Sequence, residues 1–138
     1  MKKLLFMFIL LFAFLIVSGC NNNSVNQIKA DYFNVGFGQS WYEGVNKVDK
    51  ETVQSLVKDY NQIEYSGQTN QQINYEKAIT IQFIYDGQIS GILVLDDKGV
   101  FHLRNSSGNY QIEPNNAIYE KTMEIYNEVK KQYEKGHV

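Results

Sequence analysis

The sequence predicts an α+β domain in which two helices pack on a mostly antiparallel sheet. Two observations carry this prediction. Several short alternating segments are joined by tight-turn residues, and amphipathic segments with helical spacing lie before and after them. The predicted order of elements is β-α-β-β-β-β-α.

The first expected strand spans residues 28–37, where apolar side chains alternate loosely, as in an edge or bent strand. Phe33, Val35 and Phe37 fall on one side of it. The following segment, 36–44, holds three glycines and is predicted to be a loop. It also holds Trp41, the only tryptophan of the chain, next to Tyr42.

A helix is expected to begin after Asp49, because an aspartate side chain can accept hydrogen bonds from the first free N–H groups of a helix. Ser66-Gly67 is expected to end this helix, and the polar segment 67–74 is expected to be a surface loop. The apolar residues that follow Asp49 at helical spacing are Val53, Leu56, Val57, Tyr60 and Ile63.

An antiparallel meander is predicted for residues 79–112. Strand 79–85 is followed by Asp86-Gly87, a strong hairpin signal, and by strand 89–95. The run 92–95 is apolar on both faces, which indicates a central strand covered on both sides. Turns at 96–99 and 105–108 then lead to strands 100–104 and 109–112.

The last expected element is a helix over 117–135, with Pro114 and two asparagines just before it and Gly136 at its end. Its apolar and aromatic residues form one broad face. At the level of element order alone, the complete β-α-β-β-β-β-α succession is similar to the TATA-binding-protein-like arrangement.

The N-terminal residues 1–19 have the layout of a secretory signal: Lys2 and Lys3, no acidic residue, and an apolar run from 4 to 17. These fourteen apolar residues fall short of the ~20 needed to cross a bilayer. The run closes on Val17-Ser18-Gly19-Cys20, which resembles the lipobox of bacterial lipoproteins. The resemblance implies cleavage before Cys20 and attachment of membrane lipid to its thiol. Residues 20–27 are then the lipidated cysteine with a polar tether, and 28–138 a single domain.

Charge and cysteine content exclude several classes of function. Without residues 1–19 and their two lysines, 11 basic side chains face 15 acidic ones, a balance of −4 that disfavours nucleic acid as a partner. Cys20 is the only cysteine, which leaves no disulfide, thiolate metal site or cysteine nucleophile in the domain.

Candidate catalytic groups are few, and we predict no catalytic, metal-binding or cofactor-binding residue. His102 has only Ser90 and the pair Asp96-Asp97 as conceivable partners, and no nucleophile elbow is present. Ser55 and Lys58 match S-x-x-K without the companion motifs of penicillin-recognising enzymes. An acidic row on the last helix lacks a histidine at helical spacing and is expected to be a solvated face: Glu120, Glu124 and Glu128.

Surface recognition therefore remains as the expected mode of action. Phe37, Trp41 and Tyr42 lie together in a glycine-rich segment, and Tyr and Trp are typical interface anchors. If two of the three are exposed, this segment is the expected contact site. The alternative is that Trp41 folds back over the sheet edge and closes a core that is poor in Leu and Met.

The element order, with a helix start at 49–53 and a glycine-turned meander, also resembles small uncharacterised lipoprotein domains of Gram-positive bacteria, which implies no activity. We expect a non-enzymatic, lipid-anchored protein on the outer face of the plasma membrane that contacts a membrane or wall-associated protein. One version is exclusion or inhibition, as with lipoproteins encoded by phages or mobile elements. The alternative is a module that binds a small ligand or wall fragment through the aromatic segment 36–44.

Overall fold

Eight strands form one sheet in the computed structural model, which describes residues 23–113 and 116–136. Every neighbouring pair of strands is antiparallel, in the spatial order β1-β4-β8-β7-β6-β5-β2-β3. The strands are β1 (Asn23–Ser24), β2 (Tyr32–Phe37), β3 (Ser40–Glu43), β4 (Glu64–Thr69), β5 (Ile79–Tyr85), β6 (Gln88–Leu95), β7 (Val100–Leu103) and β8 (Asn109–Ile112), and the helices are α2 (Lys50–Asn61) and α3 (Ile118–Lys135).

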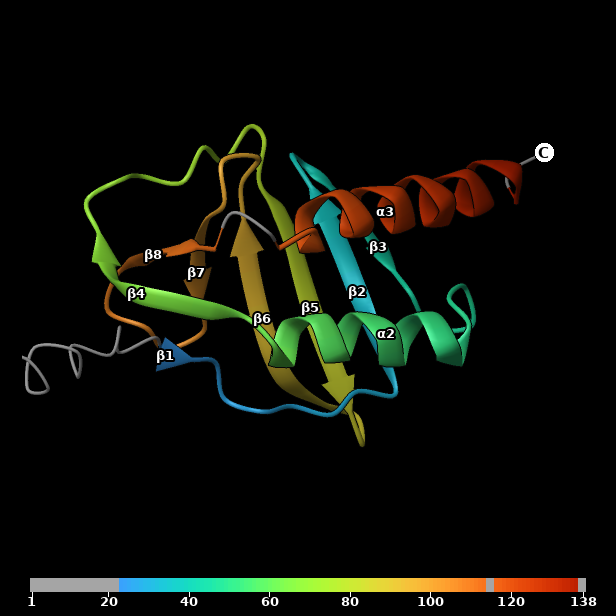
Figure 1. Cartoon of the computed structure of the whole chain (residues 1–138). Coiled ribbons are helices and arrows are strands. Elements are labelled where there is room, and N and C mark those ends of the chain that lie inside the picture. Colours follow the sequence, from blue (N-terminus) through green and yellow to red (C-terminus); the bar gives the residue numbers. More distant parts are fainter. Residues whose placement is uncertain (1–22, 114–115, 137–138) are drawn as a thin grey trace, which may run out of the picture.

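Both helices lie on the same face of the sheet, so the predicted α+β class is confirmed (Figure 1). The core fills the space between this face and the helices. Phe33 and Phe83 from adjacent strands are fully buried there, with their rings 6.2 Å apart, and α2 contributes Leu56. Burial of such side chains contributes roughly 1.5–3 kcal/mol each to folding.

Helix α2 begins where the sequence predicts. The Asp49 carboxylate accepts hydrogen bonds from the backbone N–H of Thr52, at 2.9 Å, and from its hydroxyl, at 2.8 Å. The helix ends earlier than predicted, at Asn61. The Asn61 side chain binds both backbone groups of Ile28, which fastens this helix end to the N-terminal segment.

The central position predicted for residues 92–95 is confirmed, since β6 lies between β5 and β7. Its helix-facing residue Leu93 is fully buried. On the other face, Val94 packs against a small apolar cluster of Ile73, Ala78 and Val100. The loop that connects β4 to β5 therefore covers part of the sheet face that the helices leave free.

Three strands of the structure were not predicted from the sequence, and the first predicted strand, 28–37, is shorter in the structure, where β2 begins at Tyr32. β3 lies within the segment 36–44 that was expected to be a loop, and β4 includes the first residues of the expected loop 67–74. β1 and the buried Val25 lie within the expected tether, so the described part of that tether belongs to the fold. These additions also depart from the element order that supports the likeness to the TATA-binding-protein arrangement.

Candidate functional site

Trp41 is the most exposed aromatic residue of the strands, and its side chain lies on the sheet face that is turned away from the helices. A two-residue turn with Gly38 at φ +60° joins β2 to β3 and sets the register Gly36↔Trp41. The indole lies against the backbone of Gly36, because a Cβ built there would be 2.3 Å from the Cε3 atom of Trp41. Trp41 is nevertheless 47% exposed, so its outer ring face is available to a partner.

We call the sheet face turned away from α2 and α3 the open face. Strand register sets two rows of side chains across it, because residues that pair across strands share a face. The first row consists of Trp41, Gly36, Thr80, Val94 and His102, and the second contains Glu43, Asn34, Gln82 and Ile92.

The part of the open face on β2 and β5, next to Trp41, is polar and uncharged. The Asn34 amide donates to the Gln82 side-chain carbonyl at 3.1 Å, and its own carbonyl accepts from the Gly44 N–H at 3.3 Å. Thr80 lies beside this pair in the first row. An aromatic ring next to fixed amides is a surface suited to binding a neutral polar partner.

Phe37 and Tyr42 point to the opposite face and pack on α3. The Phe37 ring lies 5.8 Å from that of Tyr126, and the Tyr42 ring lies 5.5 Å from Tyr126 and 5.3 Å from Tyr133. Both residues are half-buried. Of the three predicted contact residues only Trp41 is exposed, so the condition that two of them be exposed is not met.

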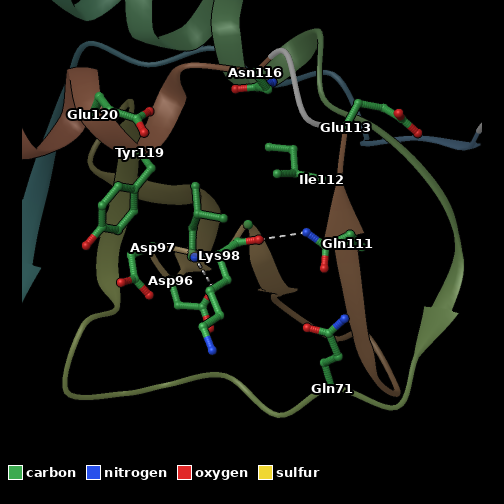
Figure 2. Close-up of a pocket in the computed structure, with 12 residues that line it drawn as sticks. Gln71, Asp96, Asp97, Lys98, Gln111, Ile112, Glu113, Asn116, Tyr119 and Glu120 are labelled. Atoms are coloured by element: carbon green, nitrogen blue, oxygen red, sulfur yellow. Dashed lines mark hydrogen bonds between the residues drawn. The ribbon is translucent and has the colours of Figure 1, made fainter.

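A cavity of about 540 Å³ lies where the β6–β7 turn meets the start of α3 (Figure 2). Figure 2 shows the carboxylates of Asp97, Glu113 and Glu120 spread around its rim instead of converging on one point. Among the described residues, no group of three or more His, Cys, Asp or Glu side chains could hold a metal ion.

Tyr119 lines this cavity, and its hydroxyl donates to the Lys77 carbonyl at 2.7 Å. Partial burial raises the pKa of the Tyr119 phenol, and the neighbouring carboxylates of Asp97, Asp96 and Glu120 raise that pKa further. The phenol is therefore neutral at ordinary pH. It serves to tie α3 to the segment before β5.

Asp96 is fully buried at the edge of the cavity, and its hydrogen bonds explain how a carboxylate can be buried there. Its carboxylate accepts from the backbone N–H groups of Lys98, Val100 and Asn74, at 3.0, 2.9 and 3.0 Å. These bonds hold the β6–β7 turn and attach the β4–β5 loop to it. Asp96 is thus a structural carboxylate, and Gly99 at φ +80° serves the same turn.

His102 contacts a serine that the sequence analysis missed. Its Nδ1 atom lies 3.1 Å from the Gly108 carbonyl oxygen and 3.3 Å from Ser106 Oγ. A carbonyl only accepts, so Nδ1 carries the proton and cannot take one from Ser106. The hydroxyl of Ser90, the predicted partner, instead donates to the Lys29 carbonyl at 2.7 Å.

The Ser55-Lys58 motif is likewise not assembled as a reactive pair. Ser55 Oγ accepts a hydrogen bond at 2.6 Å from Lys121 of α3, which also forms an ion pair with Asp59. These contacts fasten the two helices to each other. The acidic row Glu120, Glu124 and Glu128 is exposed, as the expected solvated face would be.

No family model matches the chain, and no curated protein or solved structure matches it either. Cys20 and the lipobox lie outside the described residues. Within the part of the chain that the structure describes, no helix is long and apolar enough to span a membrane.

Proposed function

We propose that this protein is an exported lipoprotein, anchored through Cys20 on the outer face of the plasma membrane, that acts without catalysis by contact through its open face. The lipobox residues Val17-Ser18-Gly19-Cys20 support the anchor. The exposed Trp41, seated on Gly36 in a fixed orientation, supports the contact. A rigid, half-exposed tryptophan offers a large contact area at little cost in conformational entropy.

The distribution of charge indicates what kind of surface the partner presents. Trp41, Thr80 and the Asn34–Gln82 pair carry no charge. In the second row Glu43 stands at one end, and Arg104, whose N–H binds the Ile92 carbonyl, stands at the other. A partner with a neutral, hydrogen-bonding surface fits the uncharged area between them. We favour a membrane or wall-associated protein, whose binding would exclude or inhibit another machine at the cell surface.

A wall fragment is the second candidate. The observation that favours it is the same Trp41 ring beside fixed amide groups, because sugar rings stack on aromatic faces and their hydroxyls bind amides. Such a fragment would bind Trp41 and the open face, and not the whole aromatic segment 36–44 that the sequence suggests. Direct binding of purified wall fragments to the domain, lost in Trp41→Ala, distinguishes this candidate from a protein partner.

Site-specific photo-crosslinking in intact cells tests the proposed contact. A photoreactive residue at the exposed Glu43 samples the open face beside Trp41 and leaves the Asn34–Gln82 pair intact, and one at Lys58 samples the exposed side of α2 as the matched control. We expect a discrete protein adduct from position 43 that disappears in Trp41→Ala and is absent from position 58. Adducts of equal yield from both positions, unaffected by Trp41→Ala, would contradict a contact through the open face.

A further inference from the structure

The described part of the fold begins at Asn23, three residues after the proposed lipid attachment site. β1 starts at Asn23, and the next residue after it, Val25, is 3% exposed and donates its N–H to the Ile63 carbonyl. Three residues of fully extended chain span about 10 Å, compared with about 25 Å for the seven-residue tether expected from the sequence. The connection between lipid and fold is therefore short.

This connection is attached to one extreme edge of the sheet. β1 occupies one end of the strand order and β3 the other, with six strands between them. At about 4.8 Å per spacing, the two edges are about 34 Å apart when measured along the twisted sheet. In Figure 1, β1 lies at the left of the molecule, and β3 lies behind α3, beyond β5 and β2.

Neither broad face of the domain is suited to lie on lipid. On the helix-covered side, α3 carries four glutamates and four lysines, so this side has no basic surplus that would attract an anionic bilayer. The open face carries the hydrogen-bonded amides of Asn34 and Gln82, and transfer of such polar groups out of water is costly. The β1 edge, by contrast, holds the described residues nearest to Cys20 in the sequence, so an upright domain that stands on this edge needs no contact between either broad face and the lipid.

We propose that the β1–β4 edge is the surface that faces the bilayer, and that the β3 edge with Trp41 is the side farthest from it. The proposal rests on the proposed lipidation of Cys20. In this orientation the partner's binding surface stands tens of ångströms above the lipid headgroups. The partner is therefore a wall-side or extracellular part of a macromolecule, and not the headgroups themselves.

Energy transfer from the domain to the membrane tests this orientation. Because Cys20 is the only cysteine and its thiol is consumed by the lipid, an engineered cysteine takes up a thiol-reactive donor dye selectively. Ser24→Cys reports the β1 edge, Gln39→Cys the β2–β3 turn beside Trp41, and Glu124→Cys the helix-covered side; all three positions are exposed. The full lipidated chain is placed in vesicles that contain an acceptor-labelled lipid.

We expect strong transfer from position 24, loss of most of it at position 39, and an intermediate value at position 124. Equal transfer from positions 24 and 39 would mean that the domain lies flat and would overturn the proposal. A variant with a ten-residue Gly-Ser insertion after Asn22 is expected to lose transfer at position 24, because the short connection is what holds this edge near the lipid.

Lipid labelling of the same samples separates this inference from the proposed function. Chains that carry lipid on Cys20 but show equal transfer refute only the orientation. Chains that carry no lipid on Cys20 refute the anchor itself, and with it the premise of the orientation.

Discussion

The indole of Trp41 lies on the backbone of Gly36 in the neighbouring strand, so closely that a single methyl group at residue 36 would overlap it. An aromatic ring that covers a glycine across a strand pair shields backbone that would otherwise be open to water. The same contact orients the only tryptophan of the chain. Gly36 is thus expected to position Trp41 as well as to stabilise the sheet edge.

Gly36→Ala is expected to displace the indole and to lower the free energy of unfolding by about 1–3 kcal/mol, the usual cost of overpacking. Urea unfolding measures the loss, and the fluorescence of Trp41 reports the displacement. The control is the same substitution in a Trp41→Ala background, where the overlap is gone and the cost of Gly36→Ala should shrink. An equal cost in both backgrounds would show that Gly36 and Trp41 are not coupled.

The buried carboxylate of Asp96 offers a second test, of the turn beside the cavity. Asp96→Asn replaces one acceptor oxygen by an NH₂ group that faces backbone N–H donors, so we expect a loss of about 1–3 kcal/mol in the free energy of unfolding. Asp97→Asn is the matched control. Its 3.1 Å ion pair with Lys77 is largely solvated, and its loss should cost under about 1 kcal/mol. Equal effects would contradict the structural role of Asp96.

Alkaline pH is expected to weaken the fold through Tyr60. Burial raises the pKa of the Tyr60 phenol above its usual value of 10.0. At a pH above that value the unfolded chain releases the phenol proton while the folded protein retains it, so stability is complete below pH 10 and falls as the pH rises further. Urea midpoints from pH about 9 to about 11 measure this. Tyr60→Phe should flatten the decline, and an unchanged slope would assign it to other groups.

Trp41→Ala tests the contact surface independently of partner identity. The side chain is half exposed, so its removal is expected to abolish crosslinking from position 43 while the variant remains folded. Tyr75→Ala is the control for non-specific loss of an aromatic residue, because Tyr75 is 70% exposed in the β4–β5 loop. Loss of the adduct in both variants would show that any exposed aromatic residue has this effect, and would contradict a specific contact through Trp41.

The elements with strong local patterns could be predicted from the sequence. The Asp49 cap, the Asp86-Gly87 hairpin and the apolar run 92–95 each carry a signal within a few residues, and each is found in the structure. β4 carries no such signal, because only Tyr65 among its residues is apolar. Its position depends on contacts with distant residues: the Tyr65 ring lies 5.6 Å from Phe101 and 4.6 Å from Tyr110.

The candidate site was predictable in part, for the same reason. The sequence singled out Trp41, but three glycines in 36–44 concealed the fact that it stands on a strand. Without β3, the two adjacent rows that place Trp41 near Thr80 and near the Asn34–Gln82 pair could not be recognised, because these rows exist only through strand register. The opposite orientations of Trp41 and Tyr42 follow from the same register.

Mass spectrometry of the N-terminal peptide from membrane-purified protein tests the central claim, anchoring through Cys20, most directly. We expect a chain that begins at Cys20 with a diacylglyceryl group on the thiol, and loss of both the modification and membrane retention in Cys20→Ser. A chain that keeps residues 1–19, or an unmodified Cys20 in protein that remains on the membrane, would contradict the account.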